Sequence, residues 1–172
     1  MGEPNDLIPL GRRGRGPAIG RGIRIAALGA LGVGVAIQFV PVDRTNPPVT
    51  REIRWDAEAT RDLARGACYD CHSNETAWPW YARVAPASWL VAADVTEGRA
   101  HLNFSTWDQP NEDAEEIIEM VLEGRMPLKK YSLMHPEARL DDDARSALVE
   151  GLRATLEADP PVSDSDAPAG HR

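Results

Sequence analysis

Hydrophobic residues are concentrated in one long run near the N-terminus. From Ile25 to Val40 the sequence reads IAALGALGVGVAIQFV, in which Gln38 is the only polar side chain. The run is apolar on all sides of a helix, whereas a helix on the surface of a soluble domain carries a single apolar stripe. Ile23 and Val42 extend it toward the roughly 20 residues that span a bilayer. The pattern predicts a transmembrane anchor over residues 25–42, and the alternative is a buried helix of a soluble protein.

The flanks of this run indicate how it is processed and oriented. Five Arg stand against two acidic residues in the first 24 positions, so residues 1–24 carry a formal charge of +3. The apolar segment of a signal peptide is shorter, about 7–15 residues, and no small-x-small cleavage site follows the run. Basic flanks remain in the cytoplasm. We therefore expect an uncleaved single-pass anchor in the inner membrane, with everything after Val42 on the far side, which in a bacterium is the periplasm.

Beyond the run, apolar residues recur at helical spacing. Asp56 is placed to cap a first helix that continues to about Gly66 and leads into a pair of cysteines. Pro86 suits the first position of a second helix, which ends near Gly98. Both segments end at a glycine, which is typical of a helix C-terminus.

Two more helices are indicated nearer the C-terminus. Asn111 can cap a third helix that Gly124 ends, and Asp141 can cap a fourth that ends at Asp159 and Pro160. Their apolar stripes are Ile117, Ile118, Val121 and Leu122 in the third helix, and Leu148, Val149, Leu152 and Leu156 in the fourth. No period-2 run of β-branched residues competes with these stripes. The predicted fold class is all-α, a small helical domain preceded by one transmembrane helix.

Proline and polar residues mark the boundaries of this domain. The stretch PVDRTNPPVT that follows the anchor reads as an extended tether. The C-terminal residues have almost no apolar content and are expected to be disordered. The expected organisation is a cytoplasmic basic N-terminus (1–24), the anchor (25–42), the tether (43–54), a folded helical domain (55–158) and a disordered tail (159–172).

The net charge narrows the classes of partner. The chain carries a formal charge of -8, and the part beyond residue 24 carries -11. A protein that binds nucleic acid needs a basic face, so no nucleic-acid partner is expected. An acidic domain instead suits redox partner proteins with a basic docking face, because complementary charge speeds encounter. Ordinary solubility is the other explanation of this charge.

The candidate chemistry lies in Cys68-Tyr69-Asp70-Cys71-His72, which contains the only two cysteines of the chain. This C-x-x-C-H spacing is that of c-type haem attachment. Two thiols one helical turn apart can each add to one vinyl group of the porphyrin, while the adjacent imidazole becomes the proximal ligand of the iron. We therefore expect one covalently attached haem c, held by Cys68 and Cys71 and ligated by His72. The five Trp of the chain could pack against this large flat group or form an ordinary core.

Three other uses of a cysteine pair compete with this interpretation. A Cys-x-x-Cys redox pair normally precedes a helix in a βαβ setting, which an all-α chain lacks. A structural zinc site needs two further ligands, and only His101, His135 and His171 are available besides His72. A plain disulfide would suit an oxidising compartment.

The chain from Gln38 to Leu152 resembles the bacterial haem-binding domain family, single-domain proteins with an N-terminal anchor and a C-x-x-C-H site. The matching stretches are IQFVPVDRTNPP, CYDCHSNETAWPWYARVAPASW, EGRAHLNFSTW and GRMPLKKYSLMHPEARL. The resemblance implies a cytochrome c-like domain that binds haem and transfers electrons.

The resemblance also points to a second axial ligand. Cytochromes c with one haem commonly carry a distal methionine, followed by proline, in a loop before the C-terminal helix. The segment Gly124-Arg125-Met126-Pro127 has that form and place, which favours Met126. Leu128 stands where the usual loop has a second proline. Met134, His135 and His101 stay open as alternatives.

Further roles follow from what a bound haem needs. A ligating histidine donates its other ring N–H to an acceptor. In cytochromes c this acceptor is often a proline carbonyl, here Pro86 or alternatively Pro79. Donors for the haem propionates are available among Trp89, Trp107, Tyr131, Arg83 and Arg99.

With His72 and Met126 on the iron, no position is left for a substrate, and the expected function is electron transfer rather than catalysis. Methionine ligation raises the reduction potential, so a positive midpoint potential is expected. One alternative is a peroxidase-like haem enzyme, which needs an open iron and a nearby acid–base residue such as His101. The other is a sensor in which a small gas molecule displaces Met126.

Overall fold

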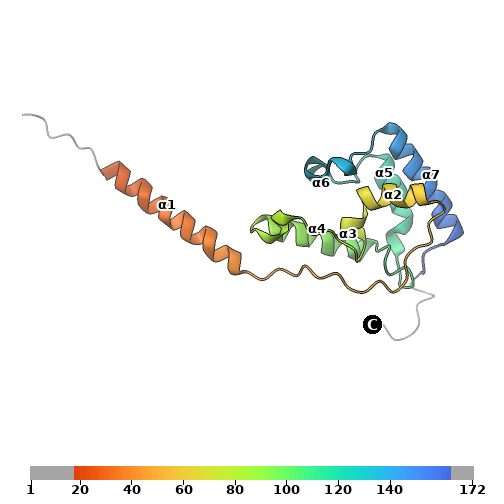
Figure 1. The fold of residues 1–172 in the computed structure, drawn as a ribbon, viewed down its shortest axis with the longest axis horizontal. Helices are drawn as coiled ribbons and strands as arrows, with labels where there is room; N and C mark the ends of the chain where they lie inside the picture. The colour runs from red at the N-terminus through yellow and green to blue at the C-terminus, as the bar shows by residue number, and fades with distance from the viewer. Residues whose placement is uncertain (1–17, 164–172) are drawn as a thin grey trace, which may run out of the picture. The chain divides into compact units, whose positions relative to one another are not determined.

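The computed structural model describes residues 18–163, and over this range the chain is built of helices joined by loops (Figure 1). The helical elements are, in chain order, α1 (Ala18–Ala36), η1 (Ile37–Phe39), α2 (Glu58–Ala67), α3 (Tyr69–His72), η2 (Trp80–Arg83), α4 (Ala87–His101), η3 (Glu112–Glu115), α5 (Glu116–Leu122), α6 (Lys129–Met134), η4 (Pro136–Ala138) and α7 (Asp142–Ala158). No strand occurs between residues 18 and 163, where only two isolated β-bridges pair Arg51 with Thr106 and Pro110 with Val162. The prediction of an all-helical fold is confirmed.

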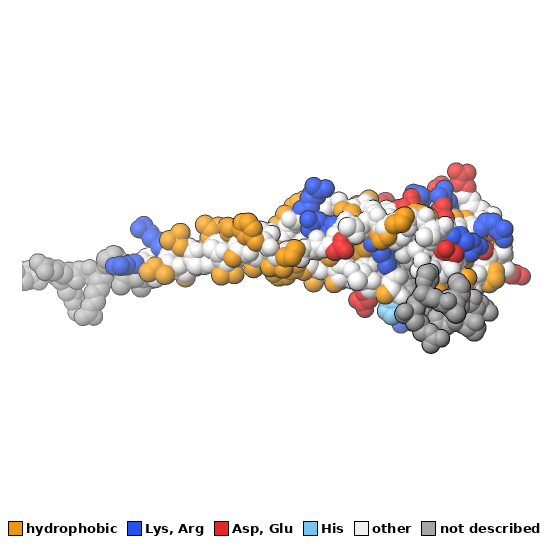
Figure 2. Space-filling model, turned by 90° about the horizontal axis from the view of Figure 1, so that it is seen from below, with side chains coloured by type: hydrophobic (Ala, Val, Ile, Leu, Met, Phe, Trp, Pro, Cys, Tyr) orange, Lys and Arg blue, Asp and Glu red, His pale blue; other side chains and the backbone are white. Residues whose placement is uncertain are grey.

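The chain forms two compact units, and the first ends at Pro41. It consists of α1 and η1, which together provide a continuous candidate membrane span, Gly20–Phe39, of 20 residues with a mean hydropathy of 1.7. Figure 2 shows this helix covered by hydrophobic and small side chains, with arginines gathered toward its N-terminal end. The prediction of one helix long and apolar enough to cross a membrane is confirmed. Its described part begins before Ile25 and includes Arg21 and Arg24, whereas residues 1–17 of the predicted basic N-terminus lie outside the described residues.

The four helices predicted for the second unit are present as α2, α4, η3 with α5, and α7. Asp141 caps α7 as predicted, because its carboxylate accepts the N–H of Ala144 at 2.8 Å. Gly124 follows α5 with a φ of 65°, the left-handed conformation that ends a helix and favours glycine.

Two predicted caps are wrong, because their side chains make tertiary contacts instead. The cap position of α2 is Ala57, and the Asp56 carboxylate accepts the hydroxyl of Thr155 in α7 at 3.0 Å. The Asn111 side chain caps nothing and accepts the backbone N–H of Asn103 at 2.8 Å.

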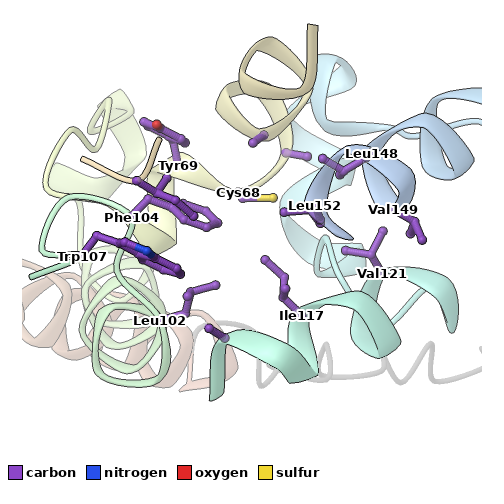
Figure 3. Close-up of a cluster of buried hydrophobic side chains, with 14 residues drawn as sticks. Cys68, Tyr69, Leu102, Phe104, Trp107, Ile117, Val121, Leu148, Val149 and Leu152 are labelled. Atoms are coloured by element: carbon purple, nitrogen blue, oxygen red, sulfur yellow. The ribbon is translucent and has the colours of Figure 1, made fainter. Parts of the chain in front are cut away.

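The core of this unit forms where α2, α5 and α7 pack together (Figure 1). Helices α2 and α7 approach so closely that a Cβ added at Gly151 would lie 2.8 Å from the Cβ of Thr60. Only glycine fits at such a crossing, since real Cβ atoms do not approach other heavy atoms so closely. The buried cluster comprises Ile53, Ala64, Ala67, Cys68, Tyr69, Leu102, Phe104, Trp107, Ala114, Ile117, Val121, Leu148, Val149 and Leu152 (Figure 3).

Residues 43–54, predicted as a tether, lie along the surface of the second unit, and we call them the strap. The N–H groups of Thr50 and Ile53 donate to the carbonyls of Ser105 and Phe104, each at 3.0 Å. The Asn74 amide donates to the carbonyl of Pro48 at 2.9 Å. Because these bonds hold the strap to the helices, the compact unit begins at Val42 and not near Trp55.

The predicted disordered tail is packed at its beginning. Asp159 is buried, and its carboxylate forms an ion pair with Arg51 and accepts the backbone N–H of Arg54 at 2.9 Å. Val162 is joined to Pro110 by a β-bridge. Residues 164–172 of the predicted tail lie outside the described residues.

Candidate functional site

The two cysteines and His72 occupy a single helical turn. The N–H of Cys68 donates to the carbonyl of Ala64 at 2.8 Å and closes α2, while the Cys68 carbonyl accepts the N–H groups of Cys71 and His72 at 3.1 and 2.9 Å. The two thiols are therefore one turn apart, and the imidazole follows directly. Helix α4 packs against this turn, because a Cβ at Gly98 would lie 2.6 Å from the carbonyl oxygen of Cys71.

The Cys68 thiol is buried and the Cys71 thiol is partly buried. Burial, and to a smaller degree the neighbouring Cys71, raises the pKa of Cys68 to about 12. Burial also raises the pKa of Cys71 to about 11, with the carboxylates of Asp94 and Asp70 adding to the effect. In Figure 3 the sulfur of Cys68 lies between the aromatic side chains and the aliphatic side chains of the core. Both groups are thus protonated thiols at neutral pH.

The other uses of a cysteine pair depend on groups that stabilise a thiolate, in a redox Cys-x-x-Cys pair as in a zinc site. Burial instead raises the pKa of both thiols. The two cysteines are free. Among residues 18–163 no three His, Cys, Asp or Glu side chains are grouped to hold a metal ion, and His171 lies outside the described residues.

The His72 ring is held by a backbone carbonyl. Its Nδ1 lies 3.2 Å from the carbonyl oxygen of Leu102, which can only accept, so Nδ1 carries the hydrogen and Nε2 keeps its lone pair. Burial lowers the pKa of His72, and this outweighs the opposite effect of the carbonyls of Leu102 and Gly98. The imidazole is therefore neutral at neutral pH, with Nε2 available as a ligand.

The carbonyl beside the His72 ring is that of Leu102, and not one of the two proline carbonyls expected from the sequence. The carbonyl of Pro86 accepts the N–H of Trp89 at 3.1 Å, and the carbonyl of Pro79 accepts the N–H of Ala82 at 3.0 Å. Leu102 follows α4 directly, where the end of the helix leaves a carbonyl without a helical partner.

Met126 is the methionine that reaches the core. Its side chain is partly buried and packs against the cluster that contains Cys68. The loop that carries it is joined to the end of α5, since the N–H of Met126 donates to the carbonyl of Met120 at 3.0 Å, and Arg145 of α7 donates to the carbonyl of Val121 at 2.7 Å. Met134, in contrast, is 54% exposed.

The two alternative histidines are engaged by other side chains. His135 receives contacts on both nitrogens, with the hydroxyl of Tyr81 2.7 Å from Nε2 and the carboxylate of Glu137 3.0 Å from Nδ1. The side chain of His101 is 62% exposed and pairs with Asp113 at 2.6 Å. Neither is held as an open ligand beside the cysteines, whereas His72 follows Cys71 directly and Met126 packs against the core.

Asp70, between the two cysteines, is a site residue that sequence reasoning missed. Its carboxylate accepts the hydroxyl of Tyr131 and the backbone N–H of Ala77, each at 2.9 Å. Burial raises the pKa of Tyr131, so its hydroxyl stays protonated and remains a donor. These contacts join the motif to α6. The sequence carries no signal for them, because the middle positions of the motif are free to vary.

Three of the predicted propionate donors are committed to other partners. Tyr131 donates to Asp70, and the Trp107 indole, fully buried, donates to the carbonyl of Asp159 at 3.0 Å. The Arg99 guanidinium donates to the carbonyls of Ser73 and Thr45 and to the side chains of Asn46 and Thr76, at distances of 2.8 to 3.0 Å. Trp89, 37% exposed, and the exposed Arg83 remain candidates.

Comparison with known proteins identifies one family. The family model described as haem-binding domain matches residues 32–154 of the 172-residue chain. No curated protein and no solved structure gives a significant match.

Proposed function

The chain belongs to the haem-binding domain family, and from this premise we propose that it is a membrane-anchored c-type cytochrome that transfers electrons. One haem is joined covalently to Cys68 and Cys71, with His72 and Met126 as its axial ligands. The observation that carries the proposal is the turn in which two protonated thiols and a neutral imidazole stand side by side.

The state of the thiols fits covalent attachment. In each attachment the S–H bond breaks, the sulfur bonds to the inner carbon of a vinyl group, and the hydrogen goes to the outer carbon. The addition consumes no oxidant and has no leaving group, so it needs a free thiol and is blocked by a disulfide. Cys68 and Cys71 are both free.

The nitrogen and sulfur donors fit the two axial positions. The Leu102 carbonyl fixes the tautomer and the orientation of His72 and increases the basicity of its Nε2. The thioether of Met126 is a soft donor that suits haem iron. Packing of Met126 against the cluster that contains Cys68 supports its role, and the contacts of His135 and His101 argue against theirs.

Electron transfer follows from this ligand set. Haem iron accepts and releases one electron as it alternates between its ferric and ferrous states. His72 and Met126 close the two axial positions, and the apolar core around Cys68 excludes water. Burial and a methionine ligand favour the reduced state, so the midpoint potential is positive.

The anchor and the charge support a location and a class of partner. Three arginines precede the candidate span and two more lie near its N-terminal end, and this charge supports a periplasmic location of the haem-binding unit at the inner membrane. This is the compartment in which bacteria attach haem covalently. The chain beyond residue 24 carries a formal charge of -11, which suits redox partners with a basic docking face.

The test is to express the full chain with a c-type maturation system and to separate it on a denaturing gel stained for haem. A stained band that is lost in Cys68→Ser/Cys71→Ser, and kept in a matched Ser73→Ala variant, is the expected result. Sharp absorption bands in the reduced state should accompany it. Haem that separates from the wild-type chain under acid denaturation would overturn covalent attachment.

A further inference from the structure

The strap is bonded to the helices of the second unit from Arg44 onward, only a few residues after the end of the candidate span in the sequence. Arg44 donates to the carbonyl of Ala82 at 3.4 Å, and Arg99 donates to the carbonyl of Thr45 at 3.0 Å. Asn46 is held from both sides, since its amide donates to the carbonyl of Thr76 and its side-chain oxygen accepts the indole N–H of Trp78. From Arg44 onward the chain is therefore part of the folded unit.

This attachment limits the distance between the unit and a membrane. The candidate span ends at Phe39, and only residues 40–44 separate it from Thr45. At about 3.3–3.6 Å per residue, a fully extended chain over that interval reaches about 20 Å. The polar headgroup layer itself is about 5–7 Å thick on each side of the hydrocarbon core. The part of the unit around Thr45 must therefore stay close to the lipid surface.

The surface beside this attachment point has the composition of a membrane interface. A hollow of about 510 Å³ is lined by Val42, Asp43, Arg44, Thr45, Trp78 and Arg83. Next to it, η2 and the residue after it expose two large apolar side chains, Trp80 at 75% and Val84 at 46%. We call Arg44, Trp80, Arg83 and Val84 the η2 surface.

The residue types of the η2 surface match the chemistry of phospholipid headgroups. Tryptophan concentrates at the boundary between lipid and water, where its ring is apolar and its N–H stays hydrated. Arginine binds phosphate through its planar fork of donors. Asp43 in the same hollow carries a negative charge, which would repel phosphate. Its carboxylate already accepts the backbone N–H of Thr45 at 2.9 Å.

We propose that the η2 surface rests on the headgroup layer of the bilayer that the anchor crosses, with Trp80 inserted between headgroups and Arg44 and Arg83 at the phosphates. This inference rests on the proposed anchor. Within the second unit, Arg99 joins the strap to Ser73 and Thr76, just after the haem motif.

The experiment uses the full haem-loaded chain in nanodiscs that contain a phospholipid with a photoreactive headgroup. After irradiation, labelled peptides are mapped by mass spectrometry. We expect labelling of residues 78–84 several-fold above that of α7, and a several-fold loss in Trp80→Ser/Val84→Ser. Leu133→Ser is the matched control, because Leu133 is also exposed, at 71%, but lies outside the η2 surface. Haem content confirms that each variant is folded.

The possible outcomes distinguish a failure of the proposed lipid contact from a failure of the proposed anchor. Photoreactive acyl chains in a parallel sample report on residues 20–39. If those residues are labelled and residues 78–84 are labelled no more than α7, the η2 surface does not rest on lipid and the inference is wrong. If residues 20–39 are not labelled either, the anchor and the inference fail together.

Discussion

At the scale of single residues, a histidine can ligate the haem iron only if one of its ring nitrogens has no other partner. His72 and His135 are both enclosed, yet only His72 keeps a nitrogen without a side-chain partner, because a backbone carbonyl holds its Nδ1. In His135, Tyr81 and Glu137 engage both nitrogens. Sequence spacing cannot distinguish these cases, since the contacts come from residues far apart in the chain.

The methionine assignment leads to a direct test. Replacing Met126 by His should keep two strong axial ligands but lower the midpoint potential by a hundred millivolts or more, because imidazole favours ferric iron more than a thioether does. Met126→Ala should open the sixth position and give a high-spin ferric spectrum. A redox titration with absorption spectra measures both.

The matched control for this test is Met134→Ala, which removes an exposed methionine of the same region. It should leave the potential and the spectrum unchanged. If Met134→Ala gives the high-spin spectrum and Met126→Ala does not, the loop presents Met134 and the Met126 assignment is wrong.

His101 provides a prediction about pH. The hydrogen bond that the His101 ring donates to the Asp113 carboxylate is the main cause that raises the pKa of His101, and nearby acidic residues add to it. A raised pKa in the folded chain means that the pair contributes to stability at low pH, and that this contribution is lost as the pH rises through the folded pKa. NMR titration of the ring should give a pKa above that of a free histidine, and Asp113→Asn should bring it down. A ring that does not titrate would instead indicate that His101 binds the iron.

At the scale of elements, the sequence predicted the long helices, because each has an apolar run, an apolar stripe or an end signal. It did not predict η2, α6 or η4, which are too short for a periodic pattern. The side-chain capping bonds expected of Asp56 and Asn111 are absent, because these polar side chains bond to distant parts of the fold. Local preference predicts that a residue makes a hydrogen bond, while the tertiary structure decides with which partner.

The crossing of α2 and α7 is the contact on which the helical core depends. Gly151→Ala places a methyl group where the side chain of Thr60 already lies. The helices must separate, so the free energy of unfolding should fall by about 1–3 kcal/mol, as in other overpacked cores. Thermal or urea unfolding of the full chain in detergent measures the loss.

Gly66→Ala is the control for this substitution. Its added Cβ meets the carbonyl oxygen of Glu137 at 3.4 Å, an ordinary contact, and α2 gains helix propensity. Stability should stay the same or increase. If Gly151→Ala is equally harmless, the crossing is looser than the structure indicates. The double variant Thr60→Ala/Gly151→Ala should recover part of the loss, because it removes the two nearest atoms.

At the scale of the whole molecule, the sequence predicted the order of the parts but not their boundaries. The apolar run and the cysteine motif are both local signals, and both were evident without a structure. The strap was not, because two prolines and several polar residues indicate an extended segment whether or not it is bound to anything. Its attachment depends on Ser105, Phe104 and Arg99, which lie about 50 residues away in the chain.

Orientation in the membrane connects the basic N-terminus to haem attachment. Replacing the five Arg of residues 1–24 by Glu removes the charges that hold this end in the cytoplasm. Part of the chain should then insert in the opposite sense or remain in the cytoplasm, where no covalent haem is attached. We expect a several-fold drop in haem staining of the membrane fraction. The amount of protein that external protease cleaves in spheroplasts should fall to the same extent.

The control is Glu3→Gln/Asp6→Gln, which makes the same end more basic and should retain full staining. Unchanged staining in the five-Glu variant would mean that the domain reaches the periplasm without these arginines. The apolar run alone would then determine the orientation of the anchor in the membrane.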